Sequence, residues 1–501
     1  MLKGRRRWAG AGALAALLLV APLARPGLHL ARTALLDRHD RPAPPRGFLD
    51  DASGLDQTRV LEVWDIPSDP GAAEQQLVAL VRRALAQGTP ISIAGARHSM
   101  GGHSIRRDGI VINMLPFRAM RLDEATNILH VQAGALWSDV LPYLNTTGRS
   151  VAVMQSNNSF SVGGSISVNG HGWQANRPPI ASTVEAFRIL GADGRVVRCS
   201  RAENTELFSL ALGGYGLFGI ILDVDLRVVP NEEYQLERYV VPSHQCTAEL
   251  EQRVAGRADV GMAYGRLSVV PDDFLREAIL SVLHRVPSGA GRPSSLEFPE
   301  IAGLTRAIFR GQVGSDYGKR LRWQAEKRVA GALSSRSLFR NQLLGEPVEV
   351  FENRSAESTD ILHEYFLPPD SLEAFLEQLR SIIPRHQGDL LNLTLRQVLR
   401  DDDTFLRYAD REMLALVMLF NQPRSAEGDS AMEAMTRDLI DAALRLGGRY
   451  YLPYRLHATT EQFRSAYPQA SRFFDRKRRY DPQQIFQNAF YTKYGGAPPS
   501  W

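Results

Sequence analysis

Apolar and polar residues alternate along the first half of the chain with periods typical of both helices and strands. Residues 73–87 place apolar side chains three and four positions apart and end at Gly88, which predicts an amphipathic helix with a glycine C-cap. Short apolar runs bounded by Gly, Asp or Asn predict strands at 91–94, 110–113, 128–132, 184–190, 196–199 and 220–229. The mixture predicts an α+β fold class, with a domain over residues 55–231.

The second half has longer apolar runs, which predict a separate domain over residues 232–449. Strands are expected at 261–269 and 413–420, and amphipathic helices at 371–383 and 431–446. Helices of this kind cover one face of an antiparallel sheet, so this region is expected to be an α+β substrate or cap domain. The segment at 450–501 mixes aromatic residues with a basic helix at 471–479 and is expected to return to the first domain.

The composition is that of a large folded protein and argues against several functional classes. A chain of 501 residues with 44% hydrophobic side chains exceeds what a single core usually serves. Its 59 basic and 55 acidic residues are spread along the sequence, which argues against a nucleic-acid partner. Cys199 and Cys246 are the only cysteines, so a disulfide framework and a thiolate metal cluster are excluded. One bridge between them or two separate buried thiols both remain open.

The N-terminus carries a targeting pattern. Its basic side chains, which belong to Lys3, Arg5, Arg6 and Arg7, precede an uncharged run at residues 8–24 that reaches the short limit for a membrane-spanning helix. Residues 1–45 are therefore expected to be a signal anchor or export signal, followed by a solvated linker at 37–45. The catalytic part is expected to be membrane-anchored or exported, although basic residues after the run weaken the prediction of its orientation.

A strand that runs into small residues at 91–104 is the first candidate binding segment. Exposed backbone N–H groups in such a turn can bind a phosphate anion, and His98 would lie beside that ligand. A turn histidine that bonds only to backbone is the alternative. The cofactor-contacting residues expected here are Ala94, Gly95, Ala96, Arg97, His98, Ser99 and Met100.

Two further segments rich in small residues have the same character. Residues 131–137 end a strand and begin a helix at 137–145, whose N-terminus favours an anion. Residues 161–172 would bring the main chain close to a flat or charged ligand. The expected contacts are Gly134, Ala135, Val162, Gly163, Gly164, Ser165, Ser167, Asn169, Gly170, His171 and Gly172. Three such turns in one domain indicate one large anionic cofactor.

The segment at 214–219 has the glycine spacing of a Rossmann dinucleotide turn, but its context differs. That turn follows a strand and opens a helix. Here a helix-like run at 205–212 comes before it and a strand at 220–229 comes after it. A Rossmann site for NAD is therefore not expected.

Together these segments resemble the FAD-binding oxidoreductases of the vanillyl-alcohol oxidase and para-cresol methylhydroxylase type. The run from Gly95 to Ser99 resembles the Gly-x-x-His-Ser turn of alditol oxidases, aldonolactone oxidases and cytokinin dehydrogenases, in many of which this histidine is bonded to the 8α carbon of the flavin. The resemblance implies FAD attached covalently through His98, with Gly214, Gly219 and Ile220 on its adenine side.

Two details refine the expected flavin attachment. His103 is a rival for the tether, but its offset from the strand does not match the pattern. Relatives with a second, cysteinyl tether place a cysteine near the position of Asn157 or Asn158, so no second bond is expected.

The substrate wall is expected at residues 450–457, near the C-terminus. Oxidation of an alcohol by a flavin needs a base for the hydroxyl proton, and Tyr454 and His457 are the candidates. By resemblance, Arg455 stands for a lysine near N1 of the flavin, where a cation stabilises the reduced form. Glu364 and Arg396 are expected in the pocket, although alternating strands make a solvated position equally plausible for each.

The resemblance implies an FAD-dependent oxidase or dehydrogenase that takes a hydride from the CH–OH group of a polyol, sugar or aldonolactone-like substrate. Its activity would be like that of D-arabinono-1,4-lactone oxidase, and oxygen or a membrane acceptor would reoxidise the flavin. Oxidation of a C–N bond, as in cytokinin dehydrogenases, and flavin binding without turnover are the alternatives.

Overall fold

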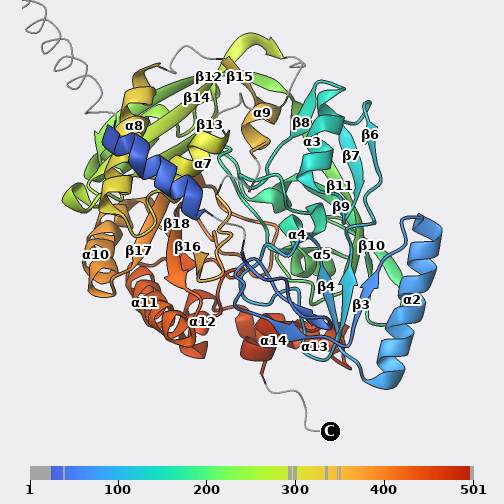
Figure 1. Cartoon of the computed structure of the whole chain (residues 1–501). Helices are drawn as coiled ribbons and strands as arrows, with labels where there is room; N and C mark the ends of the chain where they lie inside the picture. The colour runs from blue at the N-terminus through green and yellow to red at the C-terminus, as the bar shows by residue number, and fades with distance from the viewer. Residues whose placement is uncertain are drawn as a thin grey trace, which may run out of the picture.

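The computed structural model describes residues 24–37, 40–290, 296, 302–332, 337–346, 348 and 351–496 (Figure 1). The sequence-predicted signal lies almost wholly at residues 1–23 and so falls outside the described residues. Among the described residues, no helix is both long enough and apolar enough to cross a bilayer. The fold class is α+β, as predicted, with most strands in two large antiparallel sheets.

A small parallel sheet leads into the first candidate binding segment. Its strand order is β3–β5–β4, with bounds Glu62–Asp65, Ile110–Asn113 and Ile91–Ala94, and a short hairpin of β1 (Phe48–Leu49) and β2 (Thr58–Arg59) precedes it. Helix α2 (Pro70–Gln87) joins β3 to β4. Asp69 caps its N-terminus and Gly88 ends it at φ 62°, a left-handed conformation that glycine adopts at low cost. The predicted helix at 73–87 is thus confirmed.

The second sheet has six strands in the order β10–β9–β11–β7–β6, with β8 paired to β11. The bounds are Val196–Ser200, Val184–Leu190, Ile220–Pro230, Ile128–Gln132, Met120–Asp123 and Arg149–Val151. The predicted strands at 128–132, 184–190, 196–199 and 220–229 are confirmed, because each apolar run supplies the buried residues of one strand. Helices α3 (Trp137–Asn145), α4 (Val162–Ser167) and α5 (Thr205–Ala211) belong to the same part of the chain.

The third sheet has eight antiparallel strands in the order β15–β12–β14–β13–β17–β18–β16–β19. The bounds in chain order are Glu232–Pro242, Val260–Leu267, Glu277–Ala290, Ser337–Phe339, Ser358–Leu367, Asp389–Val398, Met413–Pro423 and Arg449–Tyr450 for β12 to β19. Helices α10 (Leu372–Arg385) and α11 (Ala426–Arg445) cover one face, with their apolar side chains buried (Figure 1). The opposite face therefore remains available for a site.

Among the described residues, four further helices belong to the same part of the chain as this sheet. The remaining helices of this region are α6 (Cys246–Arg253), α7 (Ala302–Arg310), α8 (Asp316–Ala332) and α9 (Arg340–Leu344). Cys246 begins α6 and Cys199 lies on β10; both are buried and free, so the two thiols form no bridge. The boundary between domains near residue 231 stays a prediction.

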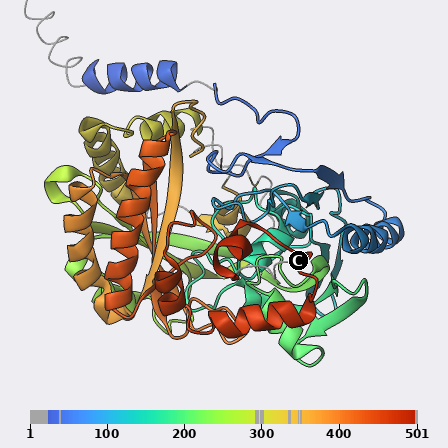
Figure 2. The same ribbon diagram turned by 90° about the horizontal axis from the view of Figure 1, so that it is seen from below.

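Of the three C-terminal helices, the first contacts α11, and the last two lie against the part of the chain that contains the two smaller sheets (Figure 2). The three helices are α12 (Thr460–Ala466), α13 (Ala470–Tyr480) and α14 (Ala489–Tyr494). Phe486 forms a parallel bridge with Ile91, and the Asn488 amide donates hydrogen bonds to the carbonyls of His103 and Tyr215 at 2.9 and 2.8 Å. This segment therefore supports the back of the first candidate binding turn.

A buried ion pair between Lys477 and Asp481 joins α13 to that support. Both side chains are at most 1% exposed, and Asp481 also accepts hydrogen bonds from the backbone N–H groups of Ile485 and Phe486. Replacing Lys477 with methionine should lower the free energy of unfolding by about 3–5 kcal/mol, because the carboxylate loses its counter-ion. Urea unfolding of the wild type and the variant measures this free energy, and Arg479→Met on the same helix is the control. The Arg479 side chain is 68% exposed, so this control should change stability by at most about 0.5 kcal/mol.

The prediction of a solvated linker at 37–45 holds only in part: residues 42–45 are exposed, but the beginning of the segment is bound to the rest of the protein. Residues 24–36 are helical, and Asp37 forms a largely buried ion pair with Arg306 of α7 at 2.6 Å. The backbone N–H groups of Asp40 and Arg41 then donate to the carbonyl of Arg354. Charge and proline content misled the prediction because the charged groups find partners on a distant part of the chain.

Candidate cofactor and substrate site

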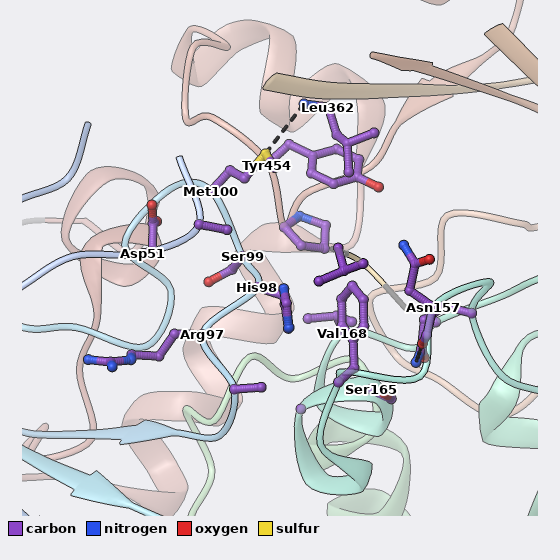
Figure 3. Close-up of a pocket in the computed structure, with 18 of the residues that line it drawn as sticks. Asp51, Arg97, His98, Ser99, Met100, Asn157, Ser165, Val168, Leu362 and Tyr454 are labelled. Atoms are coloured by element: carbon purple, nitrogen blue, oxygen red, sulfur yellow. Dashed lines mark hydrogen bonds between the residues drawn. The ribbon is translucent and has the colours of Figure 1, made fainter. Parts of the chain in front are cut away.

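A cavity of about 580 Å³ lies between the candidate binding turns and the open face of the eight-stranded sheet. Figure 3 shows His98 and Tyr454 approaching the same space from different segments. The backbone N–H of Leu362 on β16 donates to the sulfur of Met100 at 3.3 Å, so the first turn touches the sheet directly. This volume is within the range of about 300–1,000 Å³ that is typical of small-molecule sites.

The turn after β4 approaches the start of α4 closely. A Cβ atom on Gly95 would lie 1.9 Å from the hydroxyl oxygen of Ser161, so only glycine fits there. Ser161 caps α4 through the N–H of Gly164. The turn also lies against the 450–457 segment, because the N–H of Met100 donates to the carbonyl of Pro453 at 2.9 Å.

His98 lies in the wall of the cavity with its ring held on two sides. Its Nε2 atom is 3.1 Å from the carbonyl oxygen of Ser159, and its ring stacks on Phe160 with centroids 4.2 Å apart. The structure therefore contains both features considered from the sequence, a backbone hydrogen bond and a place beside the ligand space. His103 also lines the cavity, packed against Tyr215 and Phe490, and burial lowers its pKa to about 4.

Most of the sequence-predicted cofactor residues line this one cavity. They are Gly95, Ala96, Arg97, His98, Ser99, Met100, Gly163, Gly164, Ser165, Ser167, Gly170, His171 and Gly219. They come from three separate segments, which the fold brings together. The segment at 161–172 contains a short helix, α4, in place of the continuous turn that its glycines suggested.

The other predicted cofactor residues do not line the cavity. They are Ala94, Gly134, Ala135, Val162, Asn169, Gly172, Gly214 and Ile220, and their neighbours Ala133, Gly216 and Ile221 line it in their place. Three of these glycines are needed for packing within the protein, since a Cβ atom would lie 1.8–2.1 Å from a backbone carbonyl oxygen. The Asn169 amide donates to Asp401 at 2.9 Å and is buried.

Several buried polar atoms in the cavity wall have no hydrogen-bond partner among the described residues. They are Ser104 Oγ, Gln155 Oε1, His171 Nδ1, Trp173 Nε1 and Arg396 Nε. Buried polar groups without partners are costly, so a ligand with donors and acceptors along its length fits this wall. The close-packed glycines and these atoms together suit a flavin dinucleotide.

The eight-stranded sheet supplies the opposite wall through alternate residues of four strands. These residues are Tyr264 and Arg266 on β13, Asn392, Thr394 and Arg396 on β17, Val417 and Leu419 on β18, and Leu362 and Glu364 on β16. Side chains two positions apart share a face of a strand, which explains the spacing. The face that α10 and α11 leave uncovered is thus directed into the cavity.

A buried hydrogen-bonded cluster surrounds Glu364, which is 3% exposed. The Tyr454 hydroxyl donates to Oε2 of Glu364 at 3.1 Å, and Oε1 of Glu364 bonds to Nε2 of His171. Burial, followed by the nearby carboxylate, raises the pKa of Tyr454 well above its usual value. The phenol therefore stays protonated and donates its hydrogen bond to Glu364.

Arg396 provides a positive charge in the same wall and is 9% exposed. Its guanidinium donates to the hydroxyl of Ser156 at 2.8 Å and to the carbonyl of His171 at 3.5 Å. Burial lowers its pKa, and the charge of Glu364 opposes that shift.

Arg455 and His457 do not line the cavity, contrary to their predicted roles. Arg455 forms ion pairs with Asp56 at 2.7 Å and Asp429 at 2.8 Å. His457 bonds to Thr436 at 2.9 Å and also contacts Asp429. Both side chains hold the 450–457 segment to its neighbours, and their acidic partners are too far along the chain for sequence spacing to reveal.

The cavity wall also includes residues that the sequence patterns did not identify. They include Arg41, Asp50, Asp51, Gln155, Phe160, Trp173, Tyr264, Glu346 and Thr394. Those on strands could have been found from alternation with Arg266 and Arg396. Those in loops follow no period, so the sequence carries no comparable signal for them.

Comparison with known proteins shows which family part of this chain resembles. Residues 72–200 match the FAD binding domain family. Residues 72–200 are therefore similar to FAD-binding domains, and the expected resemblance to the vanillyl-alcohol oxidase and para-cresol methylhydroxylase type is confirmed.

The similar proteins include oxidoreductases of two kinds. Cytokinin dehydrogenase 10 of Oryza sativa subsp. japonica is 33% identical over 165 residues, which cover 31% of this chain and 30% of that protein. L-gulonolactone oxidase of Mus musculus is 29% identical over 170 residues, which cover 34% of this chain and 38% of that protein. Cytokinin dehydrogenase 7 of Oryza sativa subsp. japonica is 34% identical over 249 residues, or 47% of each chain. The matches thus span less than half of each of these relatives.

Proposed function

We propose that this protein is an FAD-dependent oxidoreductase that oxidises the CH–OH group of a small polyol, sugar or aldonolactone-like substrate. The FAD is bonded covalently to His98, and oxygen or another acceptor reoxidises it. The observation that carries the proposal is a single cavity that joins the glycine-rich turns of the FAD-binding domain to the buried Glu364–Tyr454 pair.

The residues of this wall have complementary tasks in such a reaction. Bound FAD supplies an acceptor for the hydride that leaves the substrate carbon. Glu364 takes the hydroxyl proton, directly or through Tyr454, whose protonated phenol can donate one hydrogen bond while accepting another. Arg396 orients the polar substrate beside them. Phe160 keeps the His98 ring in place for the bond to the 8α carbon.

Oxidation of a C–N bond is the second candidate, because cytokinin dehydrogenases are among the similar proteins. Both reactions need a base beside the reacting carbon, so the Glu364 cluster suits either one. Binding of flavin without turnover is the third candidate.

Anaerobic reduction of the purified holoprotein separates these candidates. The flavin absorbance near its visible maximum should bleach with hydroxylated compounds and remain unchanged with secondary amines. Polyols, aldonolactones, sugar acids and amines form the panel, and dithionite gives the fully reduced reference. Bleaching by amines alone would favour C–N oxidation, and no bleaching by any compound would favour binding without turnover.

A further inference from the structure

Two arginines and the candidate base lie along a short stretch of the eight-stranded sheet. The strand register aligns Arg266, Thr394, Val417 and Glu364 in one row across β13, β17, β18 and β16. Three inter-strand steps of about 4.8 Å separate the ends of this row by about 14 Å between Cα atoms. Arg396 lies two residues beyond Thr394 on the same face, so it is a diagonal neighbour of Arg266, and long side chains at such positions reach one another.

The positive charges at this place exceed the acidic groups that contact them. No carboxylate of the described residues forms an ion pair with Arg396 within 4.0 Å, and its Nε atom has no partner. Arg266 contacts Oε1 of Glu326 at 2.9 Å, but the same oxygen also accepts from Arg322 at 2.8 Å. One carboxylate is thus shared by two guanidinium groups, and a buried arginine without a contacting counter-ion is costly.

Glu364 and Glu346 are the acidic residues of the cavity wall that interact electrostatically with these arginines. Among the described residues, Asp50, Asp51, Glu352 and Asp360 also line the cavity but form no ion pair with either arginine. Glu364 is engaged by His171 and Tyr454. Glu346 lines the cavity and forms no ion pair within 4.0 Å among the described residues; burial raises its pKa, and the nearby charges of Arg266 and Arg322 oppose that shift. On the side of Thr394 away from Arg396, the Asn392 amide donates to Thr394 at 3.0 Å and its oxygen accepts from Arg322.

We propose that the substrate carries a carboxylate, which binds between Arg266 and Arg396 while the reacting CH–OH group lies beside Glu364. This inference rests on the proposed function and narrows it to hydroxy acids and sugar acids. A guanidinium binds a carboxylate through two parallel hydrogen bonds, which gives both affinity and orientation. The length of the row suits a substrate of several carbon atoms, with its acid group at one end and the reacting carbon toward the other.

Matched pairs of acids and alcohols test the proposal by binding, independently of turnover. The pairs are D-gluconate and D-sorbitol, D-glycerate and glycerol, and lactate and 1,2-propanediol. Titration calorimetry on the FAD-loaded full-length protein measures the dissociation constant of each. For at least one pair the acid should bind at least about tenfold more tightly than the alcohol. Equal or weaker binding of the acid in all three pairs would overturn the proposal.

Arginine variants locate the binding site of the acid. Arg266→Met should remove the preference for the acid, whereas Arg266→Lys should retain part of it and serves if the methionine variant does not fold. Arg320→Met is the control, because Arg320 lies on α8, pairs with Asp272 and does not line the cavity. Its preference should equal that of the wild type. An unchanged preference in both Arg266 variants would place the carboxylate elsewhere and refute the assignment.

The two levels of the proposal can fail separately. If the protein binds acids with the expected preference but no compound bleaches the flavin, the anion site stands and the oxidative function fails. If neutral polyols bleach the flavin as efficiently as the acids that bind, the oxidative function stands and the carboxylate site fails.

Discussion

Replacing His98 with alanine should release all of the FAD from the acid-denatured protein, whereas the wild-type pellet should stay yellow. The ring of His98 lies in the cavity wall, stacked on Phe160 and directed by the carbonyl of Ser159. A covalent bond survives denaturation, while hydrogen bonds to backbone turns do not. The measurement is flavin absorbance in pellet and supernatant after precipitation with trichloroacetic acid, supported by flavin fluorescence of the band in a denaturing gel.

His103→Ala is the matched control for this experiment, because His103 also lines the cavity but packs between Tyr215 and Phe490. It should keep the chromophore in the pellet. The native His98→Ala protein should still contain FAD, held by the glycine-rich turns. Free FAD from the denatured wild type would refute the tether and leave noncovalent binding intact.

Replacing Glu364 with glutamine should lower kcat by about 10²–10⁴-fold, the usual contribution of a general base. The side chains have the same shape, but the amide cannot accept the proton of the substrate hydroxyl. Stopped-flow measurement of anaerobic flavin reduction isolates this step from reoxidation. Because Arg266 and Arg396 still bind the substrate, KM should change less than kcat.

Two control variants test the choice of Glu364 over the other candidates. His457→Gln alters a residue outside the cavity and should keep most of the rate, since the His457 side chain bonds to Thr436 and Asp429, away from the cavity. Tyr454→Phe removes the hydrogen bond to Glu364 and should lower the rate by a smaller factor than Glu364→Gln. A wild-type rate in Glu364→Gln together with a large loss in His457→Gln would reverse the assignment of the base.

The secondary structure of the first half of the chain could largely be predicted from the sequence, because local interactions determine it. The strand at 220–229 was predicted from one apolar run, and β11 (Ile220–Pro230) buries that run between β9 and β7. The context of Gly214 to Gly219, with a helix before and a strand after, correctly argued against a Rossmann turn. Such features depend on residues that are close together in the sequence, so they can be predicted from the sequence.

The glycines show which part of the site prediction was inaccurate. Gly95 and Gly134 occur in similar small-residue turns, but Gly95 lines the cavity while Gly134 packs against the carbonyl oxygen of Met114. A requirement for glycine reveals a close approach, but it does not reveal whether the approaching group belongs to a ligand or to the protein itself.

The sequence by itself determined most helices and strands of the first half and pointed to segments that the structure places at one cavity, because hydrophobic period and turn chemistry are local properties. Only the tertiary structure decided which polar residues of the second half share the site. Alternation on β16 and β17 left Glu364 and Arg396 equally able to face solvent, and the position of α10 and α11 on the opposite face turned them inward. Likewise, ion pairs with Asp56 and Asp429 withdrew Arg455 from the cavity, since partners so far apart along the chain meet only after folding.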